Sequence, residues 1–300
     1  MYEKSDTTDA GIEQLVRCHI DVPAGMPAKP SDVAGAPARD QHEDADWVQA
    51  TLSSAVAWRE DARGLFVRWV AADRALRVAT AGCSDIEGTF DIDGIRWDGH
   101  QFNRTTLASW GAWHAEHEHA RSSEMVTRLV MRELISLIEA SVFDAYELFL
   151  SQNPSDILDK PENLGLKRLY TRRFDKPANW QKSWKSQMRR SREEWALHGF
   201  GKVMERYWSA ADLALPEGYD AMTLANLSAT MSLLLEMRAH ITCSSSHVSP
   251  SLARLGDLVD STHFRYEAGK PFTVDAKQME VVEAFFQAYL QLLGRALEER

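Results

Sequence analysis

An apolar stripe that ends in a charged residue is the feature that most constrains the fold of this chain. Leu224, Leu227, Met231 and Leu234 recur at alternating steps of three and four residues, which is the spacing of one face of an α-helix. The next position of the stripe is Arg238. A guanidinium on a core-facing stripe is costly unless a charge pairs with it, so Arg238 either contacts an interior carboxylate or faces a cleft.

Two further segments have the same helical period. Residues 121–150 predict a long helix that Ser122 or Ser123 caps, and residues 274–297 predict a last helix that Thr273 caps. Amphipathic helices of this kind close into an up-and-down bundle. The apolar positions of the first segment are Met131, Ile135, Ile138, Val142, Tyr146 and Phe149.

The part of the chain before these helices has a different texture. Short β-branched and aromatic runs at Leu65–Val70 and Leu76–Ala79 are typical of strands, and Asp93-Gly94 predicts a type I′ hairpin that pairs Ile92 with Ile95 and Phe90 with Trp97. Residues 1–46, rich in Pro, Ala, Gly and Asp, are typical of a flexible arm. We therefore expect an α+β, mainly α chain in three parts, with an arm at 1–46, a small β-rich region at 47–120 and a helical bundle at 121–300.

The layout of the last part resembles a HEPN domain. The resemblance rests on the helix ending at Arg238, the segment Leu255-Gly256-Asp257, the strand-like Lys270-Pro271-Phe272-Thr273 and a long last helix. It covers about the last 180 residues and is one of layout more than of letters. It implies a homodimer that joins two arginine-bearing helix ends into a metal-independent ribonuclease site. It also implies a toxin–antitoxin or anti-phage defence system, with RNA and protein partners.

The motif departs from the family pattern at its second residue. HEPN ribonucleases place a histidine four to six residues after the arginine, but after four intervening residues this chain has Cys243, followed by Ser244. His247 comes later than the pattern requires. A thiol without a cationic neighbour is a poor base near neutral pH.

A cluster of positive charge lies between the predicted helices. Residues 160–192 contain eleven Lys or Arg against Glu162 and Asp175, a local charge of +9 in a chain whose formal net charge is −10. Lys182, Lys185, Arg189 and Arg192 form one helical stripe, with Trp180, Trp184 and Met188 on the opposite side and Arg172 and Arg173 just before it. Such a surface contacts phosphates, docks an acidic segment of this chain or of a partner, or is simply a solvated face.

The composition narrows the classes of partner and ligand that remain for this chain. The acidic net charge excludes general polyanion binding over the whole surface. The three cysteines have no C-x-x-C spacing, and no long apolar run or signal peptide is present, so we expect a cytoplasmic chain with no membrane contact, cofactor or zinc site. Two side-chain groups, Asp85, Glu87, Asp91 and Asp93, and His114, His117 and His119, are better explained by a hairpin and a polar helix start than by a metal.

Two functions follow from these patterns. In the first, the chain is a HEPN-like module for RNA or protein interaction with a degenerate nuclease motif, and Arg238 is structural, paired with Glu133 or Glu139. In the second, it is an active endoribonuclease with a shifted site, in which Arg238 stabilises the phosphorane and His247 or Cys243 moves the proton.

Overall fold

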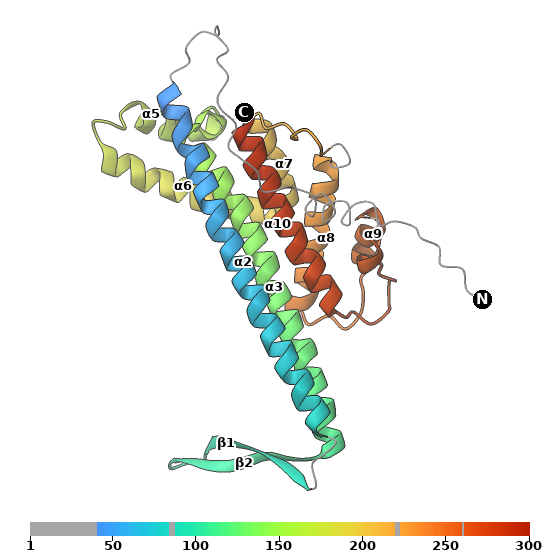
Figure 1. The fold of residues 1–300 in the computed structure, drawn as a ribbon. Helices are drawn as coiled ribbons and strands as arrows, with labels where there is room; N and C mark the ends of the chain where they lie inside the picture. Colours follow the sequence, from blue (N-terminus) through green and yellow to red (C-terminus); the bar gives the residue numbers. More distant parts are fainter. Residues whose placement is uncertain (1–40, 84–87, 220–222, 260) are drawn as a thin grey trace, which may run out of the picture.

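The computed structural model describes residues 41–83, 88–219, 223–259 and 261–300, and in 41–46 only the backbone. The described chain is mainly helical with one two-stranded antiparallel sheet (Figure 1). None of its described helices is both long enough and apolar enough to span a bilayer.

Two long antiparallel helices dominate the architecture. Helix α2 spans Gln41–Cys83 and α3 spans Ala112–Gln152, and the hairpin of β1 (Thr89–Trp97) and β2 (Phe102–Gly111) joins their far ends. Figure 1 shows this pair, which we call the arm where it extends beyond the other helices, projecting away from the remaining helices with the hairpin lying across its tip.

The remaining helices cover the other end of α2 and α3. They are α4 (Ser155–Leu158), α5 (Leu164–Thr171), α6 (Pro177–His198), α7 (Phe200–Ala210), α8 (Leu224–Thr242), α9 (Pro250–Val259) and α10 (Ala276–Glu298), with short 3-10 turns at Pro161–Asn163 and Thr262–Phe264. Helices α7, α8 and α10 pack against α2 and α3 to form a bundle. All six apolar residues predicted to face the core from residues 131–149 are buried, as are Leu227, Met231 and Leu234 of α8.

The predicted strands in residues 65–79 were wrong. Both runs lie within α2, where Thr51, Ala55, Trp58, Ala62, Leu65 and Trp69 follow one another at steps of four and three and turn toward α3. This is the spacing of a coiled-coil seam, and small alanines alternate in it with large tryptophan and leucine side chains. The predicted β-rich region is therefore helical up to Cys83.

A small antiparallel sheet was expected and is present, but its turn lies elsewhere. Phe90 to Trp97 is a single strand, and the chain reverses at Asp98–Gln101 so that Trp97 pairs with Phe102. The Asp98 carboxylate accepts hydrogen bonds from the backbone of His100 and Gln101, which lower the pKa of that carboxyl. Gly94 instead faces Leu107, whose side chain occupies the space that a Cβ at Gly94 would need.

Two helix starts also differ from the predictions. Helix α3 begins at Ala112, ten residues before the predicted serine cap, and Ser123 instead donates to Asp73 of α2 across 2.6 Å. Helix α10 is capped by Asp275, which forms a capping box with Gln278, and not by Thr273. Of the flexible segment predicted at residues 1–46, the first 40 residues lie outside the described part of the chain, and α2 begins at Gln41.

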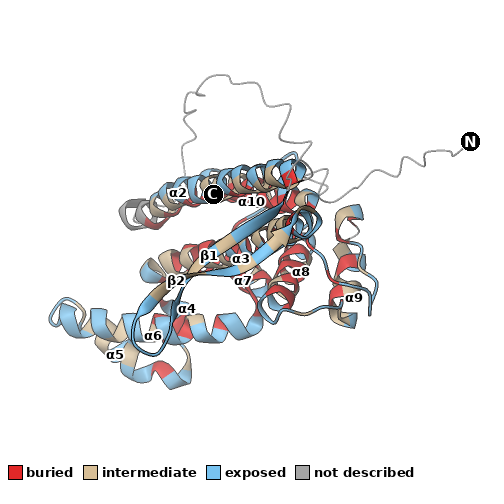
Figure 2. Cartoon of the chain, turned by 90° about the horizontal axis from the view of Figure 1, so that it is seen from below, coloured by how far each residue is buried: buried red, intermediate tan, exposed pale blue. Residues whose placement is uncertain are grey.

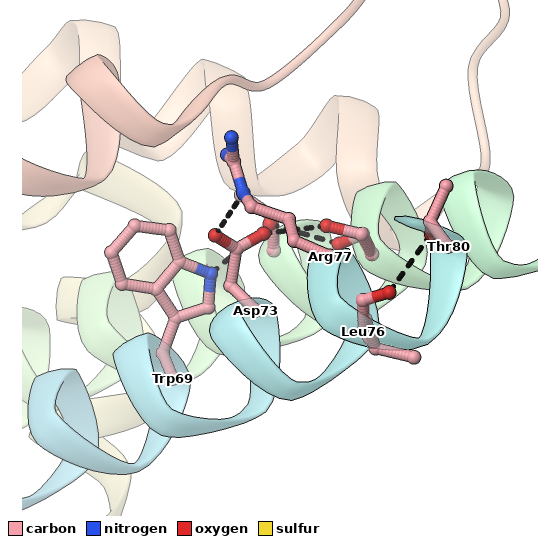
Figure 3. Close-up of polar contacts among 7 residues, drawn as sticks. Trp69, Asp73, Leu76, Arg77 and Thr80 are labelled. Carbon is pink, nitrogen blue, oxygen red and sulfur yellow. Dashed lines mark hydrogen bonds and ion pairs between the residues drawn. The ribbon is translucent and has the colours of Figure 1, made fainter. Parts of the chain in front are cut away.

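A short polar layer joins the two helices of the arm (Figure 3). Trp69 Nε1 donates to Thr127 Oγ1 at 3.0 Å, and Thr127 donates to the Ser123 carbonyl at 2.9 Å. Asp73 accepts from Ser123 and, at 2.6 Å, from Arg77. Because these bonds need particular partners on each helix, they fix the register of α2 against α3, which an apolar seam alone would specify less strictly.

Candidate functional site

The arginine at the end of α8 is held by a carboxylate of α3. Arg238 Nη1 and Nη2 donate to the two oxygens of Glu139 at 2.6 and 2.9 Å, a bidentate pair. The side chains are 22% and 16% exposed, so the pair is largely withdrawn from water. Of the two carboxylates that the sequence offered, Glu133 is at the surface, where it binds Arg132.

Cys243 and His247, the two residues considered for moving a proton beside Arg238, lie at the end of α8 and in the exposed segment that follows it. Cys243 is exposed and ends α8, and Ser244 adopts a left-handed conformation with φ of 51°. His247 is exposed, its Nδ1 lies 2.8 Å from Ser246 Oγ, and it forms a β-bridge with Pro271.

A second histidine near this helix end, His240, is buried, and both of its ring nitrogens are hydrogen-bonded. The Ser249 amide donates to His240 Nε2 at 3.1 Å, so this nitrogen is unprotonated and Nδ1 carries the hydrogen that the Glu236 carbonyl accepts at 2.9 Å. With both ring nitrogens committed to the backbone, His240 links α8 to α9 and has no free nitrogen for acid–base chemistry. It follows Arg238 by two residues, too soon for the family spacing, and the sequence carried no other signal of its role.

A hollow of about 520 Å³ opens beside this turn, between α3 and the end of α8. It is lined by Arg121, Arg128, Glu118 and Glu124 together with Ser244, among others. Both arginines are engaged, since Arg121 binds Glu118 at 2.9 Å and Arg128 reaches the Ser245 carbonyl at 3.3 Å. Neither Arg238 nor His247 lines the hollow, so the predicted catalytic residues do not converge on it.

Apart from Lys160, which precedes the 3-10 turn at Pro161–Asn163, the cations of residues 160–192 lie on α5, α6 and the turn between them. Helix α5 has no buried residue, and on α6 the buried ones are Met188, Ser191 and Trp195 in its second half. Figure 2 shows α5 and the start of α6 largely in the colour of exposed residues. We call the cations there the α5–α6 basic surface: Arg168, Arg172, Arg173, Lys176, Lys182, Lys185, Arg189 and Arg190, all of them exposed except the half-buried Arg173.

Most of these cations lack an acidic neighbour. Within the described part of the chain, no carboxylate oxygen lies within 4.0 Å of Arg168, Arg172, Lys176, Lys182, Lys185 or Arg190. Arg189 has one contact, at 3.9 Å to Glu193, and both side chains are well exposed. Lys182, Lys185 and Arg189 are exposed, as the stripe predicted, and so is Arg172, which precedes the stripe.

Arg192 is placed differently. It donates to Asp144 and, at 2.6 Å, to Glu147, both on α3. Burial alone would lower the pKa of Arg192, but the hydrogen bonds to these carboxylates outweigh it and raise that pKa. Arg192 thus anchors α6 to α3 and does not belong to the exposed surface.

Aromatic rings interleave with the cations. The Arg173 guanidinium lies 4.1 Å from the centre of the Tyr170 ring and 4.3 Å from that of Phe174. Tyr170 contacts Trp180, and Trp180 stacks on Trp184 with ring centres 5.2 Å apart. Phe174 is 81% exposed. The surface therefore offers both charge for phosphates and a ring face for a base.

The described members of the two groups considered for metal binding do not form a site. Among the described residues, no cluster of three His, Cys, Asp or Glu side chains is arranged to hold a metal ion. His119 contacts Cys83 at 3.3 Å, His114 packs on Trp110 and His117 stacks on Trp113. Asp91 and Asp93 accept hydrogen bonds from Ser109 and Thr106 of the hairpin, while Asp85 and Glu87 lie outside the described residues.

The chain was also compared with known proteins. It matches no protein-family model, no curated protein and no solved structure.

Proposed function

We propose that this chain is a nucleic-acid-binding module that contacts single-stranded RNA through the α5–α6 basic surface. The observation that carries the proposal is the concentration of exposed cations without acidic neighbours on α5 and α6, in a chain whose net charge is −10. Lys and Arg that have no carboxylate partner are free to neutralise phosphates, which supplies most of the affinity for a polyanion.

The aromatic residues favour a single strand over a duplex. Phe174 is mostly exposed, and Arg173 lies between Phe174 and Tyr170. Unpaired bases stack on such rings with about 1–3 kcal/mol per base and with little dependence on sequence. We therefore expect binding that tolerates many sequences.

A structural role for Arg238 fits this proposal better than a catalytic one. Its bidentate contact with Glu139 uses both terminal nitrogens, and among the described residues neither Cys243 nor His247 has a contact that would activate it as a base. Within the HEPN-like interpretation, the chain is then a member that keeps the helices and uses them for binding. The alternative, a nuclease with a shifted Arg238 and His247 site, predicts cleavage that the following experiment measures.

The test is the salt dependence of binding to a labelled single-stranded RNA, followed by fluorescence anisotropy in EDTA. Neutralising Lys182 and Lys185 with glutamine should weaken binding and reduce the slope of log K against log salt by about 0.7 for each lost phosphate contact. The matched control replaces Lys270 and Lys277, two exposed lysines elsewhere on the chain, and should leave the slope unchanged.

Two results would count against the proposal. Equal slopes for both double variants would place the contact elsewhere. Shortening of the RNA in EDTA, lost on His247→Ala, would instead support the nuclease.

A further inference from the structure

The tip of the arm carries an apolar surface that no described residue covers. Ile95, Trp97 and Phe102 are 71%, 58% and 74% exposed, and the Trp97 and Phe102 rings lie 5.0 Å apart across the two strands. Two rings and a branched side chain at these exposures present on the order of 400 Å² of apolar surface. A patch of this size is comparable with the largest apolar patch on a typical soluble monomer, which is often a functional surface.

The register of the hairpin shows which face this is. Side chains alternate along a strand, so Asp91, Asp93, Ile95 and Trp97 share one face of β1. The pairing register shifts between Ile92 and Asp93, and this irregularity lets Ser109 and Thr106, three residues apart on β2, both bond to aspartates of that face. The opposite face carries Phe90 and Trp110, which contact His119 and His114 of α3. The face with Trp97 and Phe102 therefore points away from the arm, and we call it the outer face.

The hairpin is also open at its edges. Its two strands pair only with each other in the described chain, so each leaves one edge of backbone N–H and C=O groups without a strand partner. Figure 1 shows the hairpin at the far end of the arm, clear of the bundle. An isolated two-stranded hairpin is marginally stable in water, and a further surface that covers one face stabilises it.

The charges near the outer face select among the possible occupants. The hairpin carries Asp91, Asp93 and Asp98 against Arg96 and Arg104, so its charge is close to zero. A polyanion or an anionic membrane would gain nothing from this balance. Arg104 and Asp93 lie on the same outer face, 3.6 Å apart at their nearest polar atoms, so the face presents both signs to whatever meets it.

We propose that the outer face of the hairpin binds the same face of a second copy of this chain, joining two arms tip to tip. A two-fold dimer requires a patch that is complementary to itself, and an apolar centre flanked by charges of both signs has that property. Two such patches bury on the order of 800 Å² of apolar surface, and the flanking strand residues bring the total toward the roughly 1,200 Å² of a small specific interface. This dimer is independent of RNA binding and of the end of α8 that carries Arg238.

The test is the mass of the full-length chain in solution, measured by sedimentation equilibrium at micromolar concentrations. The wild type should be a dimer, and Trp97→Ser/Phe102→Ser should raise the dissociation constant by about 100-fold or more, because buried aromatic residues dominate such interfaces. Both side chains are exposed in one copy, so the far-ultraviolet circular dichroism of the variant should match that of the wild type. The matched control is Leu258→Ser, which alters an equally exposed apolar residue of α9 and should leave the dimer intact.

Several outcomes would overturn the proposal. A wild type that stays monomeric throughout this range has no such interface, and a double variant that remains dimeric uses another one. Loss of the dimer in the Leu258 control would show that the effect is not specific to the tip. Binding of a monomeric wild type to vesicles of neutral phosphatidylcholine would instead assign the outer face to a lipid surface.

Discussion

The pair of Arg238 and Glu139 gives the sharpest test of whether this arginine is structural. Replacing Arg238 with methionine keeps an unbranched side chain and leaves the Glu139 carboxylate without its two donors. Breaking a fully buried ion pair costs about 3–5 kcal/mol, and the residual exposure of 22% and 16% reduces the expected loss to about 2–4 kcal/mol.

Replacing both partners should cost much less than replacing one. In Arg238→Met/Glu139→Leu no uncompensated charge remains at the α3–α8 contact, so we expect a loss of about 0–1.5 kcal/mol relative to the wild type. Glu139→Leu leaves the Arg238 charge unpaired and should cost about as much as Arg238→Met, so the coupling energy from the double-mutant cycle should be at least about 2.5 kcal/mol in magnitude. Urea unfolding followed by circular dichroism measures all four proteins under one set of conditions.

The chain contains its own control for this cycle. Arg132 and Glu133 also form an ion pair, at 2.6 Å, but on the surface, with side chains 39% and 55% exposed. Arg132→Met should therefore cost less than about 1 kcal/mol. If Arg238→Met is no more destabilising than Arg132→Met, the pair does not hold α8 to α3, and the reasoning from its burial is refuted.

Three further predictions concern packing, the arm and pH. Gly256→Ala should destabilise the chain by about 1–3 kcal/mol in urea unfolding, because an added Cβ would lie 2.2 Å from the Phe264 carbonyl oxygen; a neutral result would mean that α9 can shift. Trp69→Phe removes the bond to Thr127 and part of a buried ring, so it should cost about 1–3 kcal/mol, whereas Trp113→Phe at the exposed start of α3 should cost nothing measurable; equal effects would contradict the polar layer. Burial raises the pKa of Tyr289 and of three other tyrosines (Tyr146, Tyr207 and Tyr266) above the usual value near 10, so above pH 10 these side chains keep their protons in the folded chain and lose them on unfolding. Their contribution to the free energy of unfolding is therefore full below pH 10 and falls above it by up to about 1.4 kcal/mol per pH unit for each tyrosine. Tyr289→Phe should reduce that slope by the amount due to one proton. An ultraviolet titration in which all seven tyrosines of the native protein ionise near pH 10 would contradict this.

The helices that face a well-defined core could be predicted from the sequence, and the arm could not. The stripes of α3 and α8 consist of large apolar residues, so their period is plain. In α2 the seam alternates large residues with small ones such as Ala55 and Ala62, while valines such as Val67 and Val78 lie on the exposed side of this helix. These exposed valines raise strand propensity and blur the amphipathic contrast, and only the steps of three and four from Thr51 to Trp69, over about five turns, reveal the helix.

The hairpin turn shows a second limit. The sequence has two Asp-Gly dipeptides in this region, at Asp93-Gly94 and Asp98-Gly99, and local turn chemistry favours both. The structure uses the second, where Trp97 and Phe102 form a cross-strand pair and Asp98 caps the turn. Choosing between them requires knowing which residues on the returning strand are within reach, which is information from beyond the local sequence.

For the candidate site, the sequence identified residue types but not their partners. It placed Arg238 either against an interior carboxylate, with Glu133 and Glu139 as candidates, or facing a cleft, and only the packing of α8 on α3 selects Glu139. It assigned Arg192 to the exposed stripe because helical spacing cannot show that Asp144 and Glu147 lie opposite. In both cases the deciding contact is long-range, joining residues 99, 48 and 45 positions apart.

The packing of α2 against α10 has a consequence for how the chain is made. Gln287 of α10 donates to the Arg59 carbonyl of α2 at 3.5 Å, and these residues are 228 positions apart. At a synthesis rate of about 5–20 residues per second, α2 leaves the ribosome roughly 10–45 s before this partner exists. The arm has no such delay, because α2 and α3 are joined by a short hairpin. The nascent chain can therefore complete its arm first, while the apolar side of α2 that faces α10 stays accessible to chaperones until α10 has been synthesised.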